Sequence, residues 1–233
     1  MIALRAGTSI AEIVPERGAI CSRLALDGSE LLYLDPATLA DPQKNVRGGI
    51  PVLFPIAGKP EPGSPLKQHG WARNLAWEPT LCGPDRLECR LSENGFDLLL
   101  AFTLSERALR LDCTVAGEAP FQLGFHPYFD VKDKSAARIE TGATRALDNR
   151  TGAEVAFAPP DFTRGELDLR LLDHREAGTV LHRGAQPEVR LRWSPEFAFL
   201  VLWTLPERGF ICVEPWTRRF LEAPAALSFE ISI

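Results

Sequence analysis

Apolar and polar residues alternate along most of the chain, in short runs separated by turn residues such as Asp27-Gly28 and Asn94-Gly95. The runs recur every 8–12 residues or so, roughly the spacing of antiparallel sandwiches and barrels. They predict strands over residues 9–14, 19–26, 31–34, 86–91, 96–104, 108–115, 121–126, 153–157, 167–172, 189–193, 197–203, 210–214 and 227–233. No amphipathic stretch exceeds about two helical turns, and residues 161–166 are the best candidate for a short helix. The pattern therefore predicts an all-β, antiparallel sandwich or barrel.

Residues 43–73 interrupt the alternation and are rich in Gly and Pro. A connection this long inside a compact domain is usually functional or disordered. The run 50–56 is too apolar for disorder, so we expect it to pack onto the sheet and to hold Arg47 on one side, with His69 and Arg73 on the other. A guanidinium can donate two parallel hydrogen bonds, so this segment suits a polyol or anion site. The alternative is a surface loop with solvated charges.

Glu214 follows four apolar residues that read as a strand buried on both faces. An unpaired carboxylate in such an interior would cost at least several kcal/mol, by rough estimates. The residue therefore either pairs with an arginine or faces a polar cleft. Because Pro215 has no N–H, the ladder is expected to end there and the chain to leave the sheet. A carboxylate held in this way suits a general base.

His126 lies among aromatic residues and, like Glu214, is followed by Pro and an aromatic residue. A lone histidine in such surroundings is more often a core residue than a catalyst. If the two strand ends meet at one cleft, they would bring together an acid with an ordinary pKa of about 6.5 and a base with one of about 4.3. Such a pair can move protons at neutral pH without a metal or cofactor.

The composition predicts one domain over residues 1–233, with 45% apolar residues and no linker or repeat. The 26 basic and 31 acidic residues give a net charge of −5, so we expect no nucleic-acid partner. No apolar window of about 18 residues and no signal peptide can be read, so we expect no membrane partner and a cytoplasmic location. The five cysteines are odd in number and mostly lie within apolar runs, which predicts reduced core residues.

Several of these segments together resemble the aldose 1-epimerase (galactose mutarotase) family, including its hexose-6-phosphate branch. In chain order they are Arg47-Gly-Gly-Ile-Pro, Phe54-Pro, His69-Gly-Trp-Ala-Arg73, His126-Pro-Tyr-Phe129 and Val213-Glu-Pro. The resemblance runs from about residue 15 to residue 222. It implies a large β-sandwich, often called a supersandwich, with no cofactor and no metal. It also implies interconversion of the α and β anomers of a free aldose.

The resemblance also implies roles for individual residues. His126 matches the general acid that protonates the ring oxygen, and Glu214 matches the base that takes the proton of the anomeric hydroxyl. The substrate-binding positions would be Arg47, Gln68, His69, Trp71, Arg73 and Asp173. Among these, Arg73 matches the phosphate-binding arginine of the sugar-phosphate branch. Asp173 is the best match for an aspartate that holds ring hydroxyls, and Asp168 is its rival.

Three functions remain open from the sequence. The first is an epimerase of free aldohexoses, and the second is an epimerase of hexose 6-phosphates whose phosphate is held by Arg47 and Arg73. The third is a carbohydrate-binding module in which His126 and Glu214 bind sugar hydroxyls and catalyse no reaction. Mutarotation proceeds unaided in water, so positioned acid and base groups would suffice, and no Gly-x-Ser-x-Gly, Walker or His-Glu-x-x-His motif is present. The expected partner is a small sugar or sugar phosphate, and the expected state a monomer or homodimer.

Overall fold

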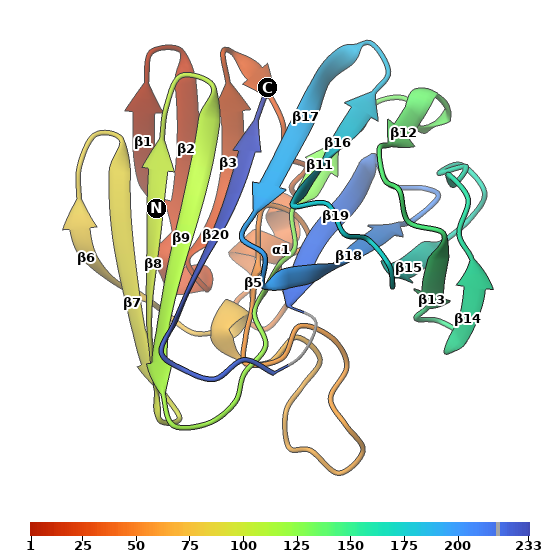
Figure 1. The fold of residues 1–233 in the computed structure, drawn as a ribbon. Helices are drawn as coiled ribbons and strands as arrows, with labels where there is room; N and C mark the ends of the chain where they lie inside the picture. Colours follow the sequence, from red (N-terminus) through yellow and green to blue (C-terminus); the bar gives the residue numbers. More distant parts are fainter. Residues whose placement is uncertain (218–219) are drawn as a thin grey trace.

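The computed structural model describes residues 1–217 and 220–233, which form an antiparallel β-sandwich (Figure 1). Three sheets account for its strands, and every ladder between two strands is antiparallel. This architecture confirms the predicted all-β sandwich. Within the described residues, no helix is long and apolar enough to cross a membrane.

A small sheet has the order β1–β2–β3–β4 and comprises Ile2–Ala6, Ser9–Val14, Ile20–Leu26 and Ser29–Glu30. A larger sheet, called the site sheet below, has the order β14–β13–β15–β18–β19–β10–β5, with β11 also paired to β19. In that order its strands are Ala153–Ala156, Arg145–Asp148, Leu167–Leu171, Phe197–Thr204, Phe210–Thr217, Gly124–Phe125 and Val52–Leu53, and β11 is Tyr128–Asp130.

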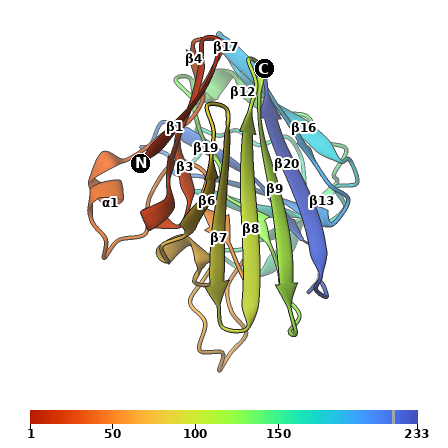
Figure 2. The same ribbon diagram turned by 90° about the vertical axis from the view of Figure 1, so that its left-hand side faces the viewer.

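The third sheet has the order β12–β16–β17–β20–β9–β8–β7–β6, and its long strands lie side by side in Figure 2. In that order they are Ala137–Ile139, Gly178–Arg183, Gln186–Trp193, Ala225–Ser232, Ala108–Gly117, Phe96–Leu104, Arg86–Glu93 and Glu78–Cys82. One short helix, α1, spans Pro36–Ala40, and single 3-10 turns span Pro15–Arg17, Ala72–Asn74 and Lys134–Ala136.

The core lies between the site sheet and the third sheet. The rings of Phe125 on β10 and Phe229 on β20 are stacked with centroids 5.3 Å apart, and both side chains are fully buried. Each side chain of this size contributes about 1.5–3 kcal/mol when it leaves water. All five cysteines are free, and four of them are buried as predicted, whereas Cys82 is exposed. This packing makes the site sheet a rigid base for the residues on its other face.

Most of the longer predicted strands are confirmed, and the errors concern short or exposed elements. β1, β4, β5, β6, β11, β12, β13 and β16 were not predicted, and residues 31–34 form only isolated bridges. The predicted helix at 161–166 is wrong: the Asp161 carboxylate accepts hydrogen bonds from Thr163 and holds a turn that buries Phe162. Helix α1, in contrast, begins at a proline after the capping residue Asp35, a favourable start that we did not recognise.

The prediction that the ladder ends at Pro215 is also wrong, because β19 continues to Thr217. The N–H of Thr217 donates to the carbonyl of Leu123, so the nitrogen of Pro215, two residues earlier, faces the same side. On that side β10 pairs at Trp216 and β11 pairs from Cys212, which leaves a gap between them. A proline is tolerated there because no ladder bond needs its missing N–H.

The apolar run 50–56 packs down as predicted, with Ile50, Val52, Leu53 and Phe54 buried. The N–H of Trp71 donates to the carbonyl of Phe54, so the two ends of the segment lie against each other. Gly70, at φ +68°, is required at this crossing, because a Cβ would stand 2.1 Å from the Phe54 oxygen. This contact sets the positions of His69 and Arg73 on either side of it.

Candidate active site

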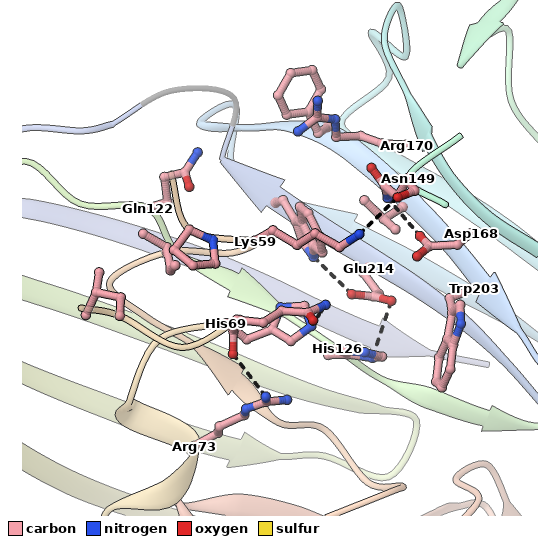
Figure 3. A pocket seen from close by; sticks show the side chains of 18 of the residues that line it. Lys59, His69, Arg73, Gln122, His126, Asn149, Asp168, Arg170, Trp203 and Glu214 are labelled. Carbon is pink, nitrogen blue, oxygen red and sulfur yellow. Dashed lines mark hydrogen bonds and ion pairs between the residues drawn. The ribbon is translucent and has the colours of Figure 1, made fainter. Parts of the chain in front are cut away.

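A cleft of about 1220 Å³ lies over the site sheet and beside the loop of residues 43–73. Its floor is formed by β15, β18 and β19, and ten of its side chains are labelled in Figure 3. Six of the eight predicted site residues line it: Arg47, Gln68, His69, Arg73, His126 and Glu214. The structure thus brings together residues that are as much as 167 positions apart in the chain.

His126 and Glu214 face each other at the gap between β10 and β11. The imidazole Nδ1 lies 3.4 Å from Glu214 Oε1 and makes no hydrogen bond among the described residues. The His126 ring is stacked on Tyr128, with centroids 4.6 Å apart and planes 6° apart, and the edge of Trp203 lies against it. The two side chains are only 6% and 1% exposed and yet both line the cleft. Their surroundings therefore hold both side chains in place, while each can still contact a ligand in the cleft.

Glu214 has a second partner on its own strand. Trp216 Nε1 donates a hydrogen bond of 3.0 Å to Glu214 Oε2. Side chains two positions apart on a strand point to the same face, so this contact is built into β19. The hydrogen bond occupies one carboxylate oxygen and leaves the other toward His126, which defines the direction in which the carboxylate can exchange a proton.

Burial shifts both members of the pair toward their neutral forms. It raises the pKa of Glu214 well above its usual range, and the negative charge of Asp168 adds to this, against the Trp216 hydrogen bond. Burial also lowers the pKa of His126 well below its usual range, followed by the charges of His69, Arg73 and Arg47. Both shifts act in the same sense: they favour a shared proton on Glu214 over one on His126.

His69 is a neutral hydrogen-bonding group at the wall of the cleft. Its Nδ1 donates to the Ala57 carbonyl, which can only accept, so its Nε2 accepts from Gln68 Nε2 at 3.2 Å. Burial, with the charge of Arg73, lowers the pKa of His69 to about 4. His69 is therefore uncharged near neutral pH and contacts His126 edge-on, with ring centroids 5.6 Å apart.

Arg47 and Arg73 give this end of the cleft its positive charge. Among the described residues neither forms an ion pair with a carboxylate. Arg73 Nη2 donates to the Gln68 carbonyl, and the Arg47 guanidinium lies 5.8 Å from the centre of the Trp203 ring. The Arg47 backbone is fixed from α1, since its N–H donates to Thr38 Oγ1 at 2.9 Å. Two guanidiniums without a carboxylate partner are able to bind an anion.

A cluster of polar side chains lies at the other end of the cleft, on the far side of Glu214 from Arg73 in Figure 3. The Asn149 amide donates to Asp168 Oδ1 at 2.8 Å, and Lys59 Nζ donates to the Asn149 carbonyl at 3.2 Å. The Arg170 guanidinium lies over the Phe199 ring, 4.8 Å from its centre. Asp168 retains a free carboxylate oxygen in this network, and that oxygen can accept a hydrogen bond from a hydroxyl.

Two predicted positions do not line the cleft. Trp71 instead packs its ring against Phe54 at the edge of the core, with centroids 5.3 Å apart. Asp173 lines a separate depression, and its carboxylate accepts hydrogen bonds from Thr144 and Arg145. The Thr144 hydroxyl is the main reason why the pKa of Asp173 falls to about 2. Asp168, the rival position, does line the cleft.

Sequence reasoning also missed cleft residues. They are Lys59, Gln122, Asn149, Arg170, Trp203 and Trp216. Trp216 could have been found, because a side chain two positions beyond Glu214 shares its face of the strand. Trp203 takes a similar place on the neighbouring strand, where it pairs with Cys212. The flat faces expected from Trp71 therefore come from Trp203 and Trp216.

A matched pair of substitutions separates the two aspartates. We expect Asp168→Asn to raise the KM for an aldose substrate by about tenfold, since it weakens a charge-assisted hydrogen bond to a hydroxyl. We expect Asp173→Asn to leave KM within about twofold and to lower only stability, because it weakens the turn at Thr144. Steady-state kinetics and thermal unfolding of the two variants provide the measurement, and a KM effect confined to Asp173→Asn would reverse the assignment.

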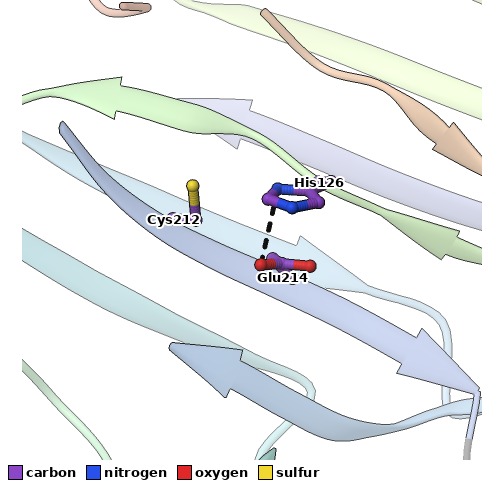
Figure 4. A group of neighbouring side chains, drawn as sticks. All are labelled: His126, Cys212 and Glu214. Atoms are coloured by element: carbon purple, nitrogen blue, oxygen red, sulfur yellow. Dashed lines mark ion pairs between the residues drawn. The ribbon is translucent and has the colours of Figure 1, made fainter. Parts of the chain in front are cut away.

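Cys212 lies beside the pair, two positions before Glu214 and on the same face of β19 (Figure 4). Its sulfur and the facing atoms of His126 and Glu214 all lie within 4.8 Å of one another, the closest approach to a metal donor set among the described residues. The surroundings oppose a cation, however. Burial and the Glu214 charge raise the pKa of the Cys212 thiol well above its usual range, and Arg47 and Arg73 lie nearby. This end of the cleft therefore favours an anion.

The fold and the cleft define a β-sandwich protein with a buried imidazole–carboxylate pair beside an arginine pair. The family described as "Aldose 1-epimerase" matches residues 1–223, almost the whole sequence. The chain therefore belongs to the aldose 1-epimerase family and is an isomerase. This result favours an enzyme over the carbohydrate-binding module and confirms the resemblance seen in the sequence motifs.

Individual relatives agree with this assignment. The protein described as "Putative glucose-6-phosphate 1-epimerase" from Cenchrus ciliaris is 28% identical, over 88% of this chain and 74% of its own. A protein of the same description from Escherichia coli K12 is 26% identical, over 87% and 81%. Among solved structures, the Slr1438 protein from Synechocystis sp. PCC 6803 has a TM-score of 0.89 at 28% identity, covering 99% and 94%. A structure from Salmonella typhimurium, described as a "putative mutarotase", has a TM-score of 0.86 at 22% identity, which shows a shared fold.

Proposed function

We propose that this protein interconverts the α and β anomers of an aldohexose 6-phosphate. Glu214 removes the proton from the anomeric hydroxyl while His126, as imidazolium, protonates the ring oxygen, and the bond between C1 and the ring oxygen breaks. The resulting aldehyde rotates about the C1–C2 bond. Closure from the other face returns a proton from Glu214 to O1 and a proton from the ring oxygen's hydroxyl to His126, so the enzyme ends in its starting form.

The spacing of the pair supports this chemistry. The anomeric hydroxyl and the ring oxygen are bonded to the same carbon, so the acid and the base must lie close together and reach the substrate from one side. His126 Nδ1 and Glu214 Oε1, 3.4 Å apart on the floor of one cleft, meet that requirement. General acid–base catalysis of about 10²–10⁴-fold per group is sufficient for a reaction that already proceeds in water.

The arginine pair is the observation that favours a phosphorylated substrate. In a hexopyranose, C6 is attached to C5, which is bonded to the ring oxygen, so a 6-phosphate must lie on the side of the general acid. The charges of both arginines lower the pKa of His126, whereas only that of Arg73 also acts on Glu214, as its weakest influence, so the pair favours the side of His126. Neither has a carboxylate partner among the described residues, so a phosphate would find both guanidiniums available. The descriptions of the relatives as glucose-6-phosphate 1-epimerases agree with this choice.

A comparison of two substrates tests the proposal. The approach to anomeric equilibrium is followed after dissolving α-D-glucose 6-phosphate or α-D-glucose, with and without the protein. We expect kcat/KM to be at least about 100-fold higher for the phosphate, the size of two charge-assisted contacts. Equal values would return the assignment to a free aldose, for which Asp168, Trp203 and Trp216 offer hydrogen bonds and apolar faces. No acceleration of either substrate would reject both.

A further inference from the structure

Positively charged side chains lie near the general acid, His126. Arg47 approaches His126 from the segment before β5, and Arg73 from the 3-10 turn after His69. Tyr128 of β11 and Trp203 of β18 pack against its faces and are uncharged, and His69 is neutral. Glu214 of β19 is the one carboxylate in contact with the ring among the described residues. A cationic imidazole is therefore disfavoured until negative charge arrives.

The family reaction starts from the opposite distribution of the proton. Ring opening needs an imidazolium at His126 and a carboxylate at Glu214, whereas burial and neighbouring charges favour the neutral pair. Both forms hold the same number of protons and differ by one transfer across the 3.4 Å contact between Glu214 Oε1 and His126 Nδ1. A negative charge bound closer to His126 than to Glu214 will therefore favour transfer of the proton to His126 without any change in pH.

We propose that the arginine pair is a separable activating site: a phosphate-type dianion held by Arg47 and Arg73 transfers the shared proton to His126, so that the enzyme also epimerises aldoses lacking a phosphate when such a dianion is supplied separately. This rests on the proposed function, because it uses the same anion site. The dianion offsets two positive charges that disfavour the imidazolium, and Arg73 lies on the His126 side of Glu214 in Figure 3. One O–H bond is broken at Glu214 and one N–H bond is formed at His126, with no other reactant consumed.

The arrangement links substrate choice to catalysis. A neutral aldose enters a cleft in which the acid is unprotonated, whereas a 6-phosphate brings the charge that protonates it. Binding energy at the phosphate is then used at the reacting centre rather than only for affinity. The two polar ends of the cleft differ in how a bound anion would affect the proton on His126. Lys59 and Arg170 lie across Glu214 from Arg73 (Figure 3), so an anion bound there would not favour the proton on His126.

The test supplies the sugar and the anion as two pieces. Mutarotation of α-D-xylopyranose, an aldose that ends at C5, is followed polarimetrically with increasing sodium phosphite and with chloride keeping the ionic strength constant. Samples without protein correct for catalysis by phosphite itself. We expect saturable activation of the protein-dependent kcat/KM by about tenfold or more, since each unit of pKa changes the imidazolium fraction tenfold. We expect Lys59→Ala, which removes a charge at the opposite end, to retain this activation ratio.

Removing the charge of one arginine provides a second test, with two expected changes. In Arg73→Ala, phosphite should no longer activate, and the phosphite-free rate with xylose should rise, because a positive charge beside His126 is gone. Arg47→Ala provides the same test should Arg73→Ala fold poorly. Competitive inhibition of glucose 6-phosphate turnover by phosphite, without activation of xylose, would overturn this inference and leave the proposed function standing. Absence of both effects, together with equal use of glucose and its 6-phosphate, would reject the proposed function as well.

Discussion

Replacing Glu214 with glutamine is expected to lower kcat by at least about 100-fold, the usual contribution of a general base. The amide keeps the shape of the side chain and can still accept the hydrogen bond from Trp216, which is 3.0 Å long in the native site. It cannot take a proton from the anomeric hydroxyl. The substrate should therefore bind nearly as before, and the loss should fall on kcat rather than on KM.

The measurement is the rate of anomer interconversion at saturating substrate, with unfolding curves to show that the variant is folded. Glu61→Gln is a suitable control, because Glu61 is an exposed carboxylate that lines the same cleft. It should keep kcat within about twofold. Native turnover by Glu214→Gln would remove the base role from this residue and, with it, the proposed mechanism.

The second large effect is expected from Arg73→Ala acting on a phosphorylated substrate. Loss of a charge-assisted hydrogen bond to phosphate should lower kcat/KM for glucose 6-phosphate on the order of 10- to 100-fold. With glucose, kcat/KM should not fall by a comparable factor and should rise, because a positive charge beside His126 is removed. The guanidinium also donates to the Gln68 carbonyl at 3.0 Å, so a small loss of stability is expected with either substrate.

The ratio of the two kcat/KM values is the quantity to compare, because it cancels any loss of folded protein. Arg175→Ala is a matched control: Arg175 is exposed and lines the separate depression that contains Asp173. An Arg73→Ala variant that loses the same factor on both substrates would show that Arg73 supports the loop rather than binding phosphate.

The fold could be predicted where one face of a strand is buried and the other is exposed to solvent. β8 and β9 are long strands of this kind, and their alternation predicted them almost to the residue. β6, in contrast, is exposed along its whole length, so no burial pattern marks it. β10 is only two residues long and owes its pairing to β5 and β19. Such pairing depends on tertiary contacts that no local pattern contains.

The site was predictable to the extent that its residues occur in dense motifs. His126, Glu214 and His69 each stand next to Gly or Pro, Arg73 follows Gly70 by three positions, and the structure places all four at one cleft. Asp168 and Asp173 lack such a context. Only the register distinguishes them, since Asp168 lies within β15 opposite Trp203, whereas Asp173 lies beyond the end of that strand. Sequence alone does not show where the strand ends.

The gap between β10 and β11 has a consequence for how such an enzyme can diversify. The proton-transfer groups occupy a break inside the site sheet, and each is anchored by backbone pairing on both sides of it. Arg47, Lys59 and Arg73, in contrast, come from the long connection before β6. Insertions and substitutions in that connection can alter the accepted sugar without moving the reacting atoms. One ancestral scaffold could thus supply catalysts for neutral and charged aldoses by revising a single segment.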